Sequence, residues 1–195
     1  MKLTPRRVRR GIAATAIAST AVLLPAIALA SPGSSAAPTN TAIPAAAHRC
    51  YASELTVWLG SPGNGTAGAT YYDLEISNTS RATSTLYGYP GVSADSGGRQ
   101  LGSAAGRDHT RPSTLLTLRP GGTAHAFLEI TEVGNYSPSA CKPVSGQLLR
   151  VYAPGDYNSL NMPFQGSFGA CSRRGPVYLH VTAMIAGTGI PGYIG

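Results

Sequence analysis

Short apolar segments with a two-residue period recur along the chain from residue 55 onward. Apolar residues alternate with polar or aromatic ones at 55–59, 72–76, 124–130 and 177–185. In an extended strand, successive side chains point to opposite faces of the sheet. Each segment is therefore predicted to be a half-buried antiparallel strand. Further short strands are expected at 86–94, 99–102, 113–118, 147–152 and 162–168.

Clusters of Gly, Pro, Asn and Ser separate these segments, as at 61–65, 95–98, 119–122 and 153–156. Such clusters are typical of turns. No segment shows a sustained helical period of apolar residues. About eight or nine short strands at this spacing predict an all-β fold, an immunoglobulin-like antiparallel β-sandwich, with a closed β-barrel as the alternative.

The ends of the chain differ from its middle. Residues 1–30 place basic residues before an uncharged stretch that ends in Ala28-Leu29-Ala30, which predicts a secretory signal peptide, cleaved before Ser31. Residues 31–48 are rich in Ala, Pro, Ser and Thr and predict a disordered linker. We expect the β-sandwich domain at 49–186 and a flexible C-terminal tail at 187–195.

The net charge of +7 would suggest a nucleic-acid or membrane partner if it belonged to the domain. Five of the fifteen Lys and Arg residues lie in the predicted signal peptide, however, and the remaining ten face eight Asp and Glu, which leaves +2. Most of the remaining cations, such as Arg49, Arg81 and Arg99, are spread singly along the sequence. We therefore expect no nucleic-acid partner, and no stable membrane anchor after cleavage.

A run in the middle of the chain carries a family resemblance. Residues 84–92 read Ser84-Thr85-Leu86-Tyr87-Gly88-Tyr89-Pro90-Gly91-Val92. They resemble the Cys-Thr-Leu-x-Gly-Tyr-Pro-Gly-Val motif of a secreted actinobacterial family, domain of unknown function 4232. The segments 72–80 and 118–124 and the late cysteines also resemble that family's landmarks. The resemblance implies an exported β-domain without an assigned activity.

The cysteines depart from the family pattern, because Ser84 stands where the family has the usual partner of Cys50. Three cysteines allow one intramolecular bridge and leave one thiol over. The resemblance implies a disulfide between Cys141 and Cys171. Cys50 is then expected to be a free thiol, either buried as a small apolar residue or joined to a second chain.

Histidines and carboxylates offer little recognisable chemistry. His125 and His180 could form a metal cluster with Asp108 or Glu129, but no metal-binding motif spacing is present. A hydrolase is a further alternative, although no nucleophile-elbow motif occurs. Asp73 and Glu75, like the two histidines, fall on the solvent-side face of their strands. We expect no catalytic residues, no metal and no cofactor.

Tyr87 and Tyr89 flank Gly88 and are candidates for ligand binding. Two rings at a rigid corner could contact a sugar or a protein, while the structural alternative packs both against the sandwich. We therefore expect a non-enzymatic interaction or structural module, secreted or associated with the cell wall. The alternative is an envelope polysaccharide-binding module that uses exposed tyrosines. The partner, protein or polysaccharide, is not identified by the sequence.

Overall fold

The computed structural model describes residues 47–60 and 64–189, all of which lie in one compact unit. The predicted signal peptide and residues 31–46 of the predicted linker lie outside the described residues. His48, expected in the linker, already pairs with Ser84 in a strand, so the folded domain begins slightly earlier than predicted. None of the helices in this part of the chain is long and apolar enough to cross a membrane.

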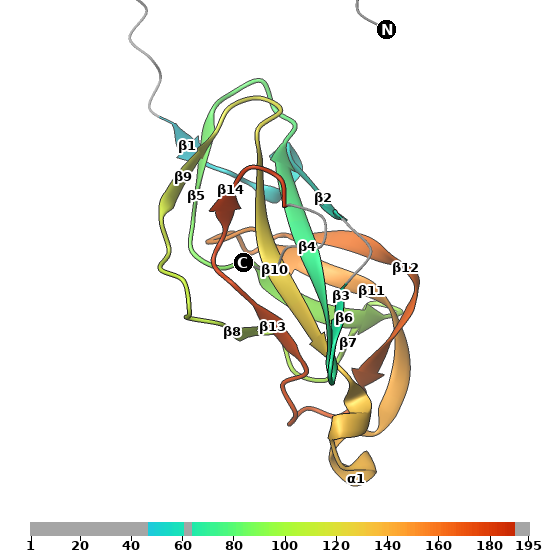
Figure 1. Cartoon of the computed structure of the whole chain (residues 1–195). Helices are drawn as coiled ribbons and strands as arrows, with labels where there is room; N and C mark the ends of the chain where they lie inside the picture. The colour runs from blue at the N-terminus through green and yellow to red at the C-terminus, as the bar shows by residue number, and fades with distance from the viewer. Residues whose placement is uncertain (1–46, 61–63, 190–195) are drawn as a thin grey trace, which may run out of the picture. The chain divides into compact units, whose positions relative to one another are not determined.

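The strands of the described residues form three sheets, which confirms the all-β sandwich, and none of the three closes into a barrel (Figure 1). The large sheet has the order β2-β4-β10-β13-β8, with β3 added to β4 and β14 added to β10. Its strands are β2 (Leu55–Leu59), β3 (Asn64–Thr66), β4 (Ala69–Asn78), β8 (Gly106–Arg107), β10 (Thr123–Thr131), β13 (Leu179–Val181) and β14 (Ile185–Ala186).

The two smaller sheets come from the remaining strands. A four-stranded sheet has the order β12-β11-β6-β7, formed by β6 (Gly91–Ser96), β7 (Arg99–Leu101), β11 (Pro143–Tyr152) and β12 (Ser159–Cys171). A three-stranded sheet has the order β1-β5-β9, formed by β1 (His48–Arg49), β5 (Ser84–Tyr87) and β9 (Leu115–Leu118). The described helical turns are η1 (Ala52–Glu54), η2 (Val133–Asn135) and α1 (Pro138–Cys141).

Two predicted strands are each divided in the structure. The segment expected at 86–94 separates into β5 and β6, which belong to different sheets. Gly88 has a φ of +105° between them, a backbone conformation that glycine adopts without a steric cost. Pro90 has no N–H for a ladder. The motif at 84–92 is therefore the place where the chain passes from the three-stranded to the four-stranded sheet.

The segment expected at 177–185 is also divided, because the chain leaves the ladder between β13 and β14. The hydroxyl of Thr182 accepts a hydrogen bond from the Phe127 backbone N–H at 3.0 Å, in place of a strand partner. β13 and β14 therefore pair with separate stretches of β10, centred on Glu129 and on His125.

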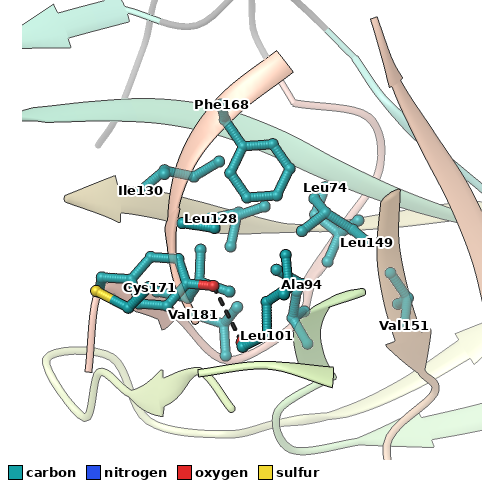
Figure 2. Packing of buried hydrophobic residues seen from close by; sticks show 14 of the residues in the cluster. Leu74, Ala94, Leu101, Leu128, Ile130, Leu149, Val151, Phe168, Cys171 and Val181 are labelled. Atoms are coloured by element: carbon teal, nitrogen blue, oxygen red, sulfur yellow. Dashed lines mark hydrogen bonds between the residues drawn. The ribbon is translucent and has the colours of Figure 1, made fainter. Parts of the chain in front are cut away.

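The main core lies between the large sheet and the four-stranded sheet. Figure 2 shows Leu74, Leu128 and Ile130 of the large sheet gathered with Leu149 and Phe168 of the four-stranded sheet. Each fully buried leucine stabilises the fold by about 1.5–3 kcal/mol relative to an exposed one. The even-numbered residues of β4 and β10 supply this face, as the alternation predicts.

A second apolar cluster lies where the three-stranded sheet covers the other end of the same inner face. Ile76 and Ala124 of the large sheet pack there with Leu86 and Leu118. One face of the large sheet is thus covered by two different sheets along its length. The opposite face is left for the polar residues described below.

The cysteines are arranged as the resemblance implies. Cys141, at the end of α1, and Cys171, at the end of β12, form a disulfide across 30 residues of sequence. A disulfide that closes a loop of this length lowers the entropy of the unfolded chain, and this effect stabilises the folded domain by roughly 3–4 kcal/mol. Cys50 is a free, fully buried thiol that is hydrogen bonded to the buried hydroxyl of Ser84. Ser84 therefore occupies the position of a bridge partner without forming a bridge.

Candidate functional site

The outer face of the large sheet carries two rows of titratable side chains. Pairing of β4 with β10 places Glu75 opposite His125, and Tyr71 opposite Glu129. β13 extends the second row, because His180 lies opposite Glu129. We call the first row, with Asp73, the covered half of this face, and the second row the open half.

A C-terminal strap, residues Ile185–Gly189, crosses the covered half. Its first two residues pair with β10 as β14, and Figure 1 shows β13 and β14 along the same side of β10. The ring Nδ1 of His125 donates to the Gly187 carbonyl at 2.8 Å, and the Gly189 N–H donates to Glu75 Oε1 at 2.8 Å. We expected a flexible tail from residue 187, but Gly187–Gly189 are packed here; 190–195 lie outside the described residues.

Under this strap the polar side chains are buried. Asp73 is 6%, Glu75 2% and His125 8% exposed to solvent. The sequence placed them on the outward face, which is correct, and predicted them to be solvated, which is wrong. Alternation specifies the face of a sheet to which a residue points, but not which later segment of the chain covers that face.

Burial changes the titration of both carboxyl groups. Desolvation raises the pKa of Glu75 above its ordinary value, although the hydrogen bond from Gly189 and the nearby His125 oppose the shift. Desolvation likewise raises the pKa of Asp73, against a smaller opposing effect of His125. The second carboxyl oxygen of Glu75, Oε2, is buried and has no hydrogen-bond partner among the described residues. Burial therefore favours the neutral form of the Glu75 carboxyl group more than water does.

The open half contains a hollow with a volume of about 20 Å³. This volume accommodates one group the size of a water molecule. The residues that line the hollow come from β4, β10, β13 and the turns that follow β8 and β13: Tyr71, Asp108, Phe127, Glu129, His180, Val181 and Thr182.

Local backbone structure fixes the polar groups of the hollow. β8 runs parallel to β13, and the Asp108 N–H donates to the Val181 carbonyl at 2.8 Å, which places Asp108 beside the sheet. Gly106 lets the His180 ring lie close to β8, because an added Cβ would be 2.9 Å from the ring carbon Cδ2. The ring Nδ1 of His180 is 4.0 Å from Glu129 Oε2, beyond hydrogen-bond distance.

This arrangement provides acceptors rather than an activated nucleophile. The Thr182 hydroxyl is engaged with the Phe127 N–H and donates to the Ala183 carbonyl. One oxygen of Asp108 accepts the Thr110 N–H at 2.8 Å, and one oxygen of Glu129 accepts the Thr131 hydroxyl at 3.2 Å. The hollow brings together Asp108, Glu129 and His180, but no group of three metal-binding side chains with suitable geometry occurs in residues 47–60 and 64–189.

Tyr87 and Tyr89 do not act as a pair. Tyr87 is 63% exposed, and Leu115, directly opposite it on β9, is 67% exposed. The Tyr89 hydroxyl is instead hydrogen bonded to the ring Nδ1 of His109 at 3.0 Å, and the guanidinium of Arg107 lies over its ring. The corner at Gly88 therefore presents one free ring, with an apolar neighbour from the adjacent strand.

Sequence reasoning missed the hollow as a unit. It considered His125 and His180 with Asp108 or Glu129 as a metal cluster and rejected that cluster for lack of a motif spacing. It did not connect Asp108, Glu129 and His180 with Tyr71 or Thr182. The signal was present in part, because Tyr71 and Glu129 both fall on the outward positions of their strands. The pairing register that sets them side by side is not contained in either segment alone.

Comparison with known proteins gives one match. The model of a family described as Domain of unknown function (DUF4232) matches residues 50–184. No curated protein and no solved structure matches the chain. The matched region begins at Cys50 and extends to the turn before β14.

Proposed function

The chain belongs to the DUF4232 family, whose description names no activity, and from this premise we propose that it is a non-enzymatic interaction module that acts outside the cell. The exposed cross-strand pair of Tyr87 and Leu115 carries the proposal. Two large apolar side chains that lie opposite each other and are both mostly exposed form a continuous surface, unlike isolated exposed residues.

The chemistry of this pair suits a protein partner. Tyrosine contributes a rigid ring and a hydroxyl group to an interface, and aromatic residues are enriched among the side chains that dominate binding. Leu115 adds an aliphatic surface that has no polar group to offer a carbohydrate. A protein with a complementary apolar surface would bury both side chains.

We keep an envelope polysaccharide as the second candidate, because Tyr87 presents a free ring. Aromatic rings are common platforms for sugars, and a single ring can contact one sugar face. In that case Tyr87 would be essential and Leu115 would contribute little. The two candidates therefore make different predictions for these two residues.

The test is retention of the exported protein on envelope fractions, one enriched in protein and one in insoluble glycan. The variants are Tyr87→Ser and Leu115→Ser, with Tyr157→Ser as the matched control because Tyr157 is 94% exposed but lies on a separate turn. We expect both test variants to lose roughly tenfold in retention on the protein fraction, while the control retains binding.

Loss of glycan retention in Tyr87→Ser alone would support the polysaccharide candidate instead. If Tyr87→Ser and Leu115→Ser are retained as well as Tyr157→Ser on both fractions, this surface is not a binding site.

A further inference from the structure

We propose that the free edge of β9 binds an extended segment of a partner protein, which adds to the three-stranded sheet as a further strand. The inference rests on the proposed function, because β9 carries Leu115 of the exposed apolar pair. It adds to that proposal the way in which the partner is held, namely by main-chain hydrogen bonds along a sheet edge.

The backbone of β5 shows which groups of this sheet are already engaged. The C=O of Thr85 accepts a hydrogen bond from the Cys50 N–H at 3.0 Å, so Thr85 directs its backbone groups toward the side of β1. Successive residues of a strand direct their N–H and C=O groups to opposite edges. Ser84 and Leu86 therefore direct theirs toward β9, on the other side of β5.

β9 consequently has one bonded edge and one free edge. Leu116 and Leu118 lie opposite the two β5 residues that face β9, and they pair with them. Leu115 and Thr117 direct their N–H and C=O groups the other way. Among residues 47–60 and 64–189, no strand pairs with that side of β9, which Figure 1 shows next to β5. Two donors and two acceptors are thus open to a further strand.

β9 lacks the features by which natural sheets keep edge strands from pairing. It contains neither a charged residue nor a proline, and both Leu115 and Thr117 are exposed. The edge strands of the four-stranded sheet differ, because β7 contains Arg99 and β12 contains Pro163. In β2, an edge of the large sheet, the central Val57 is only partly exposed. An exposed edge without charge is a template for another strand.

A segment of another protein fits this edge better than a second copy of the chain. β9 has four residues, so the pairing of two β9 strands would bring few residues together. Stable protein–protein interfaces bury about 1,200–2,000 Å² in total. An added peptide needs less area, because its main-chain hydrogen bonds supply affinity and its alternate side chains supply specificity.

The side chains around the edge restrict the sequence of that segment. The residue beside Leu115 would lie against an exposed apolar side chain, so it is expected to be apolar. Arg119 is exposed directly after β9, and residues 109–122 contain no carboxylate. An acidic residue near Arg119 is therefore favoured, and a basic one is disfavoured. The ligand class is an extended segment of β-branched residues with an acidic end.

The test is an NMR titration of the exported protein with the synthetic peptide Thr-Val-Thr-Val-Thr-Val-Glu and with the same peptide N-methylated at its three valines. When the valines lie on the same face as Leu115, their N–H groups point to β9, so methylation removes the donors that pairing requires. We expect the unmodified peptide alone to bind. It should slow the amide exchange of Thr117 roughly tenfold and leave that of Leu116 unchanged.

Two variants separate main-chain pairing from side-chain contact. Thr117→Pro removes one N–H of the free edge and leaves the residues that pair with β5 in place, whereas Thr117→Ala keeps that N–H. Thr117→Pro should weaken binding of the unmodified peptide roughly tenfold, the effect of about one lost hydrogen bond. Thr117→Ala should bind like the wild type. Protection of the Leu86 amide checks that both variants keep the sheet.

Retention on the protein-enriched envelope fraction separates this inference from the proposed function. Loss of retention in Tyr87→Ser and Leu115→Ser but not in Thr117→Pro would mean that the surface binds a protein without strand addition. Full retention of Tyr87→Ser and Leu115→Ser counts against the proposed function itself. Strand addition is overturned if neither peptide binds, if the N-methylated peptide binds equally well, or if Thr117→Pro and Thr117→Ala have equal effects.

Discussion

The two halves of the outer face of the large sheet share the strands β4 and β10 and differ in what lies above them. In the covered half, Glu75 and His125 are held beneath the C-terminal strap and bond to its backbone. In the open half, Glu129 and His180 are more exposed and surround a hollow. One pattern of polar residues thus gives a closed polar cluster at one end and an accessible cavity at the other.

The difference shows that the strap, rather than the strand sequence, determines whether these side chains are buried or exposed. Burial under the strap leaves Glu75 Oε2 without a partner and raises the pKa of its carboxyl group. Among residues 47–60 and 64–189, no such cover lies over Glu129, whose side chain is 30% exposed. Changes in the strap should therefore alter the covered half strongly and leave the open half unaffected.

The largest change in the free energy of unfolding is expected for Gly189→Ala. A Cβ at this position would lie 2.2 Å from the carboxyl carbon of Asp73, so the strap or the buried Asp73 side chain must shift. Overpacking of this kind typically lowers the free energy of unfolding by about 1–3 kcal/mol. Denaturant unfolding and amide exchange of Gly187 measure the loss. Thr188→Ala is the control, because Thr188 is exposed; equal effects of the two variants would contradict this role of Gly189.

A smaller effect that depends on pH is expected for Glu75→Gln. Because the folded-state pKa of Glu75 is raised, the folded protein holds this proton more tightly than the unfolded chain. The resulting stability is complete below the ordinary glutamate pKa and is lost as the pH rises through the raised folded value. Asp73 acts in the same direction.

Glu75→Gln should therefore flatten the decline in the free energy of unfolding between acid and neutral pH, because an amide does not titrate in this range. The measurement is denaturant unfolding at a series of pH values from 4.5 to 8, with a pH of about 4.5 near the ordinary glutamate pKa. An identical pH dependence in the wild type and the variant would show that Glu75 does not titrate in this range.

The smallest effect is expected for Glu129→Gln in the open half. Glu129 is partly exposed, and its Oε2 atom is 4.0 Å from the Nδ1 atom of the His180 ring, which is beyond hydrogen-bond distance. Substitutions at such positions usually change the free energy of unfolding by less than about 0.5 kcal/mol. Unfolding under the same conditions as for Glu75→Gln checks this. A loss as large as that of Gly189→Ala would mean that the two halves are not independent.

The sequence predicted the inner face well and the outer face poorly, for a physical reason. Leu74 and Leu128 were correctly predicted to be buried. An apolar face of a sheet becomes buried whichever apolar segment of the chain packs against it. Asp73 and Glu75 were assigned to the right face but the wrong environment, since the strap that covers them lies more than a hundred residues later in the chain. Their contact depends on tertiary structure that local periodicity does not encode.

The candidate site shows the same limit. Tyr87 could be recognised from the motif at 84–92, but its neighbour Leu115 became apparent only from the pairing of β5 with β9. Tyr89 was grouped with Tyr87 because both flank Gly88, yet its hydroxyl is bonded to His109, which lies twenty residues away in sequence. Adjacent residues in a turn can thus have unrelated roles.

The buried contact between Cys50 and Ser84 also bears on thiol–disulfide exchange. Burial raises the pKa of the Cys50 thiol, so little of it is present as the thiolate that attacks disulfides. In the unfolded chain three thiols allow three different single bridges, and Cys50 competes with the other two. Once the domain has folded, Cys50 is withdrawn from that competition. The absence of a second bridge therefore does not expose the Cys141–Cys171 bond to rearrangement within the native protein.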